Sequence, residues 1–297
     1  MAGNYQYLQV HPSSPALGAE IGGVDIAAGI DDAQFAELRR AFAEYGVIFL
    51  RDQQITPQQH IEFARRWGEI NVNRFFRAVD DYPLIAEVRK EAHQKANIGS
   101  SWHTDHSYDQ IPAMGSLLYA REVPEIGGDT LFASMYAAYD ALSDGFKAML
   151  STLQALHSSR HAFGEGAYIG ADLDDVGGRL GNTDAATQDA IHPVIIRHPL
   201  SGRPALYVNG DFTLRFDGWS EAESQPLLDY LYAHASRAEF TCRFRWRAGS
   251  MAIWDNRATH HCALNDYQGV RRLMHRITIE GVPLQAVAAK PAIAAAG

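Results

Sequence analysis

The stretch Ser100-Ser-Trp-His-Thr-Asp-His-Ser-Tyr108 decides the fold, because it places His103 and Asp105 two residues apart in a run that reads as a strand. Residues i and i+2 of a strand point to the same face, so an imidazole and a carboxylate at this spacing can bind one metal ion together. Two histidines and one carboxylate are the ligand set of non-haem Fe(II) oxygenases, in which coordination positions stay open. The stretch therefore predicts two of three metal ligands, and the third should be a second histidine.

The composition is that of a globular protein, with 297 residues, 46% of them hydrophobic and 21% charged. A formal net charge of −9 and the lack of a Lys/Arg-rich run argue against a nucleic-acid partner. No signal-peptide pattern and no apolar run of spanning length occur, so we expect no membrane association and a cytoplasmic location. The two cysteines, Cys242 and Cys262, fit a reducing compartment, and we expect both to be free buried thiols.

Short strands separated by turns dominate the expected secondary structure. Apolar spacing and capping residues predict helices over 31–45 and 56–67, ending at Gly46 and Gly68. Further helices are predicted over 135–142, 144–153 and 220–235, and one or two strands between residues 5 and 26. The other predicted strands cover 47–50, 83–88, 116–121, 131–132, 194–197, 206–208, 240–246, 251–254 and 273–279. This pattern predicts a mainly β fold, a β-sandwich or jelly roll with flanking helices.

We expect one domain over residues 1–285, followed by a loose Ala-rich tail over 286–297. Six glycines and little apolar periodicity between His161 and Asn182 predict a long surface loop. A loop of this kind, over about 161–190, can act as a lid on a site, or it can be a disordered insertion without a role.

Four motifs in order along the chain carry a resemblance to a known family. They are Trp102-His-Thr-Asp105, Gly127-Gly-Asp-Thr130, Trp254-Asp-Asn-Arg257 followed by His261, and Arg271-Arg-Leu-Met-His-Arg276. Together they resemble the TauD/TfdA family of Fe(II)- and 2-oxoglutarate-dependent dioxygenases, which includes taurine, alkylsulfatase and aryloxyalkanoate dioxygenases. The similarity runs from about residue 18 to residue 282, and it implies a double-stranded β-helix (jelly roll) core.

The resemblance implies that His103, Asp105 and His261 hold the iron, and it excludes the neighbouring His260. Four other histidines, His106, His192, His198 and His275, are expected to be hydrogen-bonded structural or surface residues.

The same resemblance implies that Thr130 and Arg272 bind the distal carboxylate of 2-oxoglutarate, and that Arg276 binds an anionic group of the substrate. A planar guanidinium can hold a carboxylate through two parallel hydrogen bonds, to which a hydroxyl adds a third. Arg272, Met274 and Arg276 share one strand face. Alternation alone leaves open whether the arginines face solvent, and the resemblance favours burial of both heads against anions.

By the resemblance, 2-oxoglutarate and O2 are consumed, succinate and CO2 are formed, and a small organic anion is hydroxylated. The product fragments where the hydroxylated carbon carries an ether oxygen, a sulfonate, an amine or a sulfate ester. Asn73 and Phe76 fall where taurine dioxygenase has a histidine and a tyrosine, which speaks against taurine itself. With Phe163 and Phe212, Phe76 forms either an aromatic wall for the substrate or ordinary core packing. We expect an aryloxyalkanoate-like carboxylate, a sulfonate or a sulfate ester.

Three alternatives remain at this point. A zinc hydrolase could use the same three ligands, but it would not need Thr130 or Arg272. A taurine-type sulfonate dioxygenase stays possible within the family. A β-sandwich binding module without enzymatic activity would tolerate loss of the three ligands. The family resemblance also implies a homo-oligomer.

Overall fold

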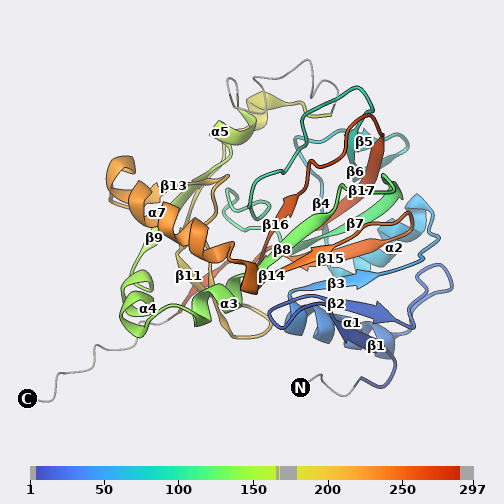
Figure 1. Ribbon diagram of the computed structural model, residues 1–297, viewed down its shortest axis with the longest axis horizontal. Coiled ribbons are helices and arrows are strands. Elements are labelled where there is room, and N and C mark those ends of the chain that lie inside the picture. The colour runs from blue at the N-terminus through green and yellow to red at the C-terminus, as the bar shows by residue number, and fades with distance from the viewer. Residues whose placement is uncertain (1–4, 165–166, 168–178, 288–297) are drawn as a thin grey trace, which may run out of the picture.

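The fold is described from a computed structural model that covers residues 5–164, 167 and 179–287 (Figure 1). Within this part of the chain the largest sheet has nine strands. Its order is β1 (Gln9–Pro12), β2 (Ala19–Gly22), β3 (Val47–Leu50), β15 (Met251–Asp255), β7 (Gly115–Glu122), β17 (Arg272–Ile279), β6 (Tyr82–Lys90) and β5 (Ala78–Val79), and β4 (Ile70–Asn71) also pairs with β17. All neighbours are antiparallel except β2 and β3.

A smaller sheet packs face to face on the inner side of the large one. Its strands are β14 (Thr241–Phe244), β8 (Thr130–Ser134) and β16 (Thr259–Ala263). Phe49 and Trp254 of the large sheet meet Phe132 and Phe244 of the small one, and the rings of Phe49 and Phe244 stack with their centroids 4.0 Å apart. Two antiparallel sheets with a shared apolar interior form the jelly-roll core that the sequence predicts.

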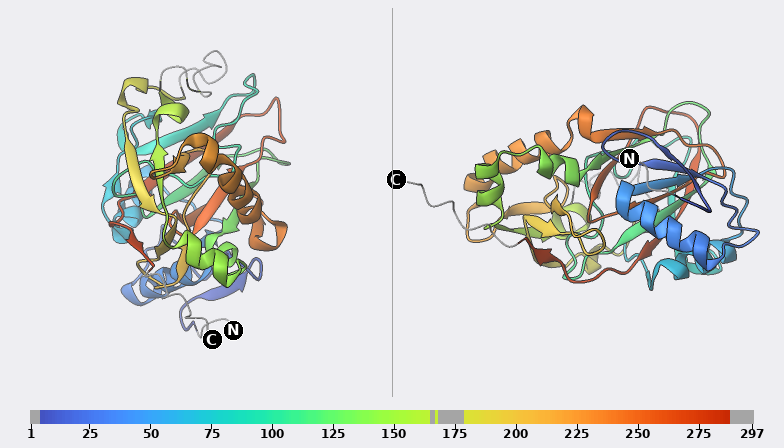
Figure 2. Two further views of the ribbon diagram at one scale, coloured as in Figure 1. Left: turned by 90° about the vertical axis from the view of Figure 1, so that its left-hand side faces the viewer. Right: turned by 90° about the horizontal axis from the view of Figure 1, so that it is seen from below.

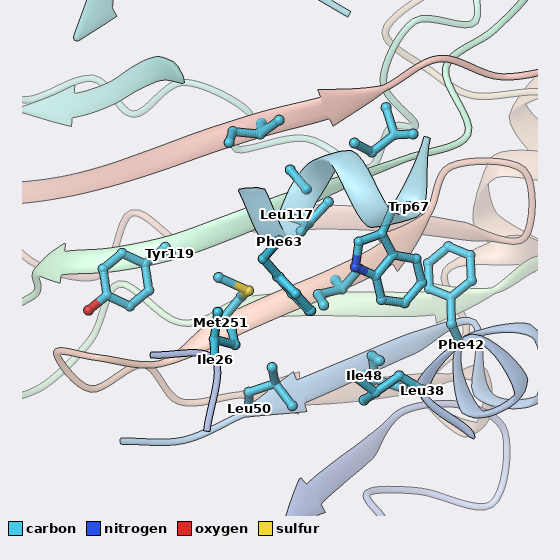
Figure 3. Packing of buried hydrophobic residues seen from close by; sticks show 14 of the residues in the cluster. Ile26, Leu38, Phe42, Ile48, Leu50, Phe63, Trp67, Leu117, Tyr119 and Met251 are labelled. Atoms are coloured by element: carbon cyan, nitrogen blue, oxygen red, sulfur yellow. The ribbon is translucent and has the colours of Figure 1, made fainter. Parts of the chain in front are cut away.

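Two helices cover the outer face of the large sheet. Asp31 caps the first, α1 (Asp32–Tyr45), and Gly46 ends it with a φ of 72°, a conformation that glycine adopts without strain. Thr56 and Gln59 form a capping box at the start of α2 (Pro57–Trp67). Figure 3 shows how their apolar faces pack on the sheet, with Phe42 and Trp67 in edge contact at 5.1 Å. This cluster fixes the sheet that carries the site.

The rest of the chain forms a second cluster at the other side of the molecule (Figure 2). It contains two three-stranded sheets, β10 (Asp189–Pro193), β9 (Gln154–Ser158) and β13 (Thr213–Phe216), and β12 (Pro204–Leu206), β11 (Ile195–Arg197) and β18 (Gln285–Ala286). The helices here are α3 (Met135–Asp140), α4 (Asp144–Leu150), α5 (Arg160–Phe163) and α7 (Glu221–Ala235), with short 3-10 turns η1 (Thr183–Ala185) and η2 (Ala238–Phe240). None of the helices in the described ranges has the length and apolar character needed to span a bilayer.

Several expectations about local structure were wrong. Residues 100–108 form a turn-rich loop instead of a strand, and only His103 makes an isolated bridge. The predicted strand at 206–208 ends at Leu206, and β9, β10, β13 and β16 were missed. The segment 161–190 contains α5, η1 and the start of β10, while residues 165–166 and 168–178 of the predicted lid lie outside the described residues. Ala286 of β18 pairs with Ile196 of β11, so the first residue of the predicted tail belongs to a sheet.

Candidate active site

The two histidines of the predicted metal site are brought together by the backbone. His103 and His261 form an antiparallel bridge, in which the His103 amide donates to the His261 carbonyl at 3.1 Å and the reverse bond measures 2.8 Å. His261 lies in the middle of β16, whereas His103 comes from the irregular loop after residue 99. The shared bridge explains how a strand residue and a loop residue present their rings to one point.

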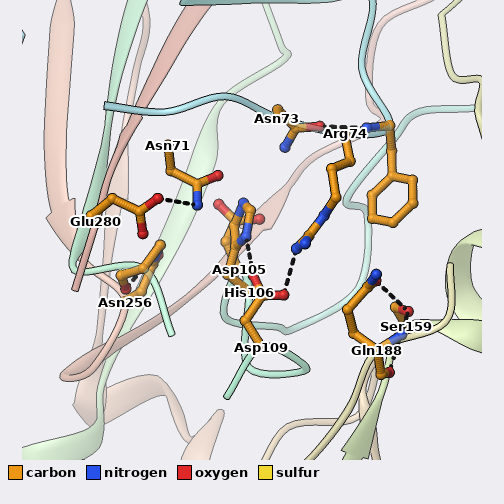
Figure 4. Close-up of polar contacts among 12 residues, drawn as sticks. Asn71, Asn73, Arg74, Asp105, His106, Asp109, Ser159, Gln188, Asn256 and Glu280 are labelled. Atoms are coloured by element: carbon orange, nitrogen blue, oxygen red, sulfur yellow. Dashed lines mark hydrogen bonds and ion pairs between the residues drawn. The ribbon is translucent and has the colours of Figure 1, made fainter. Parts of the chain in front are cut away.

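Asp105 joins them from a turn whose polar contacts keep it in place. His106 follows with a φ of 62°, a left-handed conformation that is uncommon for a residue with a side chain. Its Nδ1 contacts the Asp109 carboxylate at 2.9 Å, and Arg74 binds the same carboxylate (Figure 4). His192 Nε2 contacts the Asp109 carbonyl at 2.9 Å. This network stabilises the sharp turn directly after the carboxylate.

The three side chains converge closely enough for one ion. Asp105 lies beside both rings, with one carboxylate oxygen 3.9 Å from His103 Nε2 and the other 3.9 Å from His261 Nε2. One ligand atom from each residue lies within 4.8 Å of the other two, and all three residues are buried. A first-row metal holds nitrogen and oxygen ligands at about 2.0–2.2 Å, so two ligands of one ion are at most about 4.4 Å apart. The two 3.9 Å separations between Asp105 and the histidines lie within this limit. The donor set and its spacing therefore fit a divalent transition metal.

The protonation states suit metal binding. His103 Nδ1 lies 2.8 Å from the Ser101 carbonyl, to which only an Nδ1–H can donate, so Nε2 is the ring nitrogen that is turned toward Asp105. Burial, and then the nearby His103, hold the pKa of His261 well below its ordinary value. Burial alone would raise the pKa of Asp105, but the charge of Arg276 and the two histidines hold it well below the usual range. The carboxylate of Asp105 and the low pKa of His261 suit the binding of a divalent cation.

Both arginines of β17 are buried in the site, as predicted. Arg272 and Arg276 share the strand face of Met274, which points into the interior between the two sheets. Arg276 Nη1 lies 3.3 and 3.4 Å from the Asp105 carboxylate oxygens, and its guanidinium lies 4.5 Å from the centre of the Phe76 ring. The other arginine, Arg272, is 5% exposed, and its guanidinium makes no hydrogen bond or ion pair with any residue in the described ranges.

Arg272 and Thr130 are linked by a residue that sequence reasoning missed. The indole of Trp246 donates a hydrogen bond of 2.9 Å to Thr130 Oγ1, and the Arg272 guanidinium lies 5.9 Å from the Trp246 ring centre. Since Thr130 Oγ1 accepts this bond, its own proton is free to donate to a ligand. Burial lowers the pKa of Arg272, which marks the cost of holding a cation without a partner. A carboxylate ligand would satisfy both groups.

One cavity joins these parts, with about 740 Å³ of space including its open mouth. Its polar lining comprises the three candidate metal ligands, Thr130, Arg272, Arg276 and Asp211; its apolar lining includes Phe76, Phe163, Phe212, Val88, Ile98 and Leu118. The sequence analysis did not single out Asp211, Val88, Ile98 or Leu118, since a lone residue of these types carries no pattern.

Asn73 is the predicted site residue that the structure does not bring into this lining. Its carboxamide oxygen accepts hydrogen bonds from the backbone amides of Phe75 and Phe76, both at 2.9 Å (Figure 4). Asn73 thus shapes the turn that carries Phe76, and direct contact with a substrate stays a prediction without geometric support.

The four histidines that were predicted to be structural or surface residues are each hydrogen-bonded, as expected. His106 contacts the Asp109 carboxylate, and His192 contacts the Asp109 carbonyl. His198 contacts the Asp255 carboxylate at 2.9 Å, and His275 contacts the Arg121 guanidinium at 3.2 Å. The rejected His260 is buried, and its pKa falls to about 3, chiefly through burial. Both cysteines are free and buried, as expected.

Comparison with known proteins places the chain in a family. The model of the taurine catabolism dioxygenase TauD, TfdA family matches residues 9–278. The chain belongs to the TauD/TfdA family. It is therefore a 2-oxoglutarate-dependent dioxygenase, and this family uses Fe(II), 2-oxoglutarate and O2.

Individual TauD/TfdA members agree with the match over nearly the whole chain. An alpha-ketoglutarate-dependent sulfate ester dioxygenase of Pseudomonas putida is 35% identical, over 92% of this chain and 90% of its own length. An (S)-phenoxypropionate/alpha-ketoglutarate-dioxygenase of Sphingobium herbicidovorans is 32% identical, over 92% and 95%. A crystal structure of a taurine dioxygenase from Burkholderia xenovorans superposes with a TM-score of 0.80 at 30% identity, over 96% of this chain and 93% of that one.

Proposed function

We propose that this dioxygenase hydroxylates a small organic anion, namely an aryloxyalkanoate-like carboxylate, a sulfonate or a sulfate ester. The observation that carries the proposal is the pair of buried guanidiniums, Arg272 and Arg276, on one face of β17 in the cavity of the three metal-ligand candidates. A cavity that holds two buried cations suits two anionic ligands. One of them is the cosubstrate, and the other is the substrate.

His103, Asp105 and His261 hold Fe(II) in this proposal, because their donor atoms converge and the lowered pKa values of Asp105 and His261 suit a divalent ion. When bound, Fe(II) with 2-oxoglutarate and O2 supplies the chemistry that converts a C–H bond into C–OH, while 2-oxoglutarate becomes succinate and CO2. The three side chains line the cavity, so the cosubstrate and the substrate would lie beside them in this space.

Thr130 and Arg272 bind the distal carboxylate of 2-oxoglutarate. The guanidinium offers two parallel donors, and the Thr130 hydroxyl adds a third, aimed by the bond that it accepts from Trp246. Arg272 is the first residue of β17, and Arg276 follows four residues later and contacts Asp105. The two arginines therefore hold their anions at different depths of one cavity.

Arg276 binds the anionic group of the substrate, and the aromatic rings hold its apolar body. Phe76 lies against the Arg276 guanidinium, while Phe163 and Phe212 stack at 5.9 Å on the same cavity wall. This wall also excludes water from the reacting C–H bond. Relatives named as sulfate ester and phenoxypropionate dioxygenases support an anion with an apolar body.

A substrate panel tests this class. The protein is loaded with Fe(II) and 2-oxoglutarate without oxygen, air is admitted with a 2-phenoxyalkanoate, an alkyl sulfate or an alkyl sulfonate, and succinate is measured. Succinate above the substrate-free background, with release of phenol, sulfate or sulfite, is expected for at least one compound. Background turnover with all three would reject the substrate class. The cytoplasmic location, the homo-oligomer and the lid over 161–190 stay predictions.

A further inference from the structure

An acidic residue outside the predicted site lies directly behind one of the candidate metal ligands. Asp211 comes from the connection between β12 and β13 and lines the main cavity. Its Oδ2 lies 3.6 Å from His103 Nδ1, the ring nitrogen that faces away from Asp105. The carboxylate is therefore on the rear side of the imidazole and not on the side of the ion.

Ser101 connects Asp211 to His103 through two separate groups. Its carbonyl accepts the His103 Nδ1–H at 2.8 Å, and its hydroxyl donates to Asp211 Oδ2 at 2.8 Å. The bond to the carbonyl fixes the tautomer, and the hydroxyl fixes the position of the carboxylate. At 3.6 Å the carboxylate makes no hydrogen bond with the ring, so it acts on the ring through its charge.

Asp211 is free to exert this charge because no cation neutralises it. No Lys or Arg in the described ranges forms an ion pair with it. Its side chain is 11% exposed, and it borders a second cavity with Trp102, Tyr232 and His260.

We propose that Asp211 is a positioning residue for the metal centre, which strengthens His103 as a ligand through a negative charge behind the ring. An imidazole that binds a divalent cation gains positive charge, and a carboxylate at its rear stabilises that charge. The inference rests on the proposed function, since it needs His103 to hold the metal. It adds a role for a residue that neither touches the ion nor belongs to the four sequence motifs.

The test measures the affinity of the full-length protein for Mn(II), by calorimetry or by the signal of free Mn(II) in electron paramagnetic resonance. Asp211→Asn keeps the shape and removes the charge, and we expect it to raise the Mn(II) Kd about tenfold, within the range for outer-shell partners of metal ligands. Ser101→Ala keeps the carbonyl and frees the carboxylate, so a smaller increase, about threefold, is expected. Asp217→Asn, an exposed residue beyond β13, is the matched control and should leave the Kd unchanged.

The outcomes separate this inference from the proposed function. An unchanged Mn(II) Kd in folded Asp211→Asn would overturn the inference alone, and so would a change confined to the substrate KM, which would make Asp211 a substrate contact. Failure of the unmodified protein to bind Mn(II), or binding unaffected by His103→Ala, would overturn the proposed metal centre as well.

Discussion

Replacing Arg272 by methionine tests whether the unpaired guanidinium is the anchor of 2-oxoglutarate. The side chain is buried and has no hydrogen-bond partner in the described ranges, so its donors are available to a ligand. Two charge-assisted hydrogen bonds contribute about 1.5–3 kcal/mol each. Losing both should weaken 2-oxoglutarate binding by roughly 3–6 kcal/mol, or about 10²- to 10⁴-fold in Kd.

The same substitution should stabilise the ligand-free protein. Methionine fills a similar volume without the desolvation cost of an unpaired buried cation, whose partial relief we put at about 1–3 kcal/mol. In a chain of this length that corresponds to a rise in Tm of roughly 2–6 °C. A rise in Tm together with weaker binding would distinguish the loss of an unpaired cation from unfolding of the site.

The assay is thermal unfolding with Mn(II) at increasing concentrations of 2-oxoglutarate. A ligand that binds only the folded state raises Tm with its concentration, so the curve reports the Kd. Arg271→Met is the matched control, because that neighbour is 36% exposed, pairs with Glu91 and Glu122, and should change neither quantity. Native 2-oxoglutarate affinity in a folded Arg272→Met protein would refute the reasoning.

Three further predictions concern the substrate anion, the cosubstrate pocket and the pH dependence of stability. Arg276→Gln should raise the substrate KM by about 10–100-fold, because one charge-assisted contact is lost. The 2-oxoglutarate Kd should stay within about threefold of its original value. An unchanged KM in steady-state assays would reject Arg276 as the anion site. Trp246→Phe removes the donor to Thr130 Oγ1 and should raise the 2-oxoglutarate Kd about tenfold in the same thermal assay; no change would show that the hydroxyl needs no such support. His60 is fully buried, and burial, followed by the charges of His275 and Arg121, lowers its pKa to about 3. In the unfolded chain this histidine takes up a proton near pH 6.5, whereas in the folded protein it stays neutral down to about pH 3. The free energy of unfolding should therefore be unaffected by His60 above about pH 6.5 and should decrease as the pH falls toward 3, by about 2 kcal/mol at pH 5. Denaturant titrations of His60→Leu should show a smaller loss between pH 7 and pH 5, and an equal loss would contradict the assignment.

The N-terminal helices and the central strands could be predicted from local signals alone. Asp31 and Thr56 cap the starts of two helices, and Gly46 and Gly68 follow their last residues. The four consecutive apolar residues at 47–50 indicate a short buried strand. Local signals are weak for strands that depend on distant partners. β9 gains its place from pairing with β10 and β13, which lie more than thirty residues away along the chain.

The sequence prediction grouped His103 with Asp105 as the structure does, but it assumed the wrong backbone conformation for them. Strand alternation was the reason for linking His103 with Asp105, but the structure uses a bridge to β16 and a turn with His106 in a left-handed conformation. Tertiary contacts of Asp109 with Arg74 and His192 stabilise that turn, and no local pattern encodes them. Trp246 and Asp211 were missed for the same reason, because their roles arise from contacts with residues over one hundred positions away.

The central claim is tested most directly by measuring succinate from 2-oxoglutarate in the presence of the best compound of the panel, with Fe(II) and with Zn(II) in parallel. The account predicts O2-dependent succinate with Fe(II), in about equal amount to the hydroxylated or fragmented product, and none with Zn(II). Product formation with Zn(II) and without succinate would contradict the account and show metal-assisted hydrolysis instead.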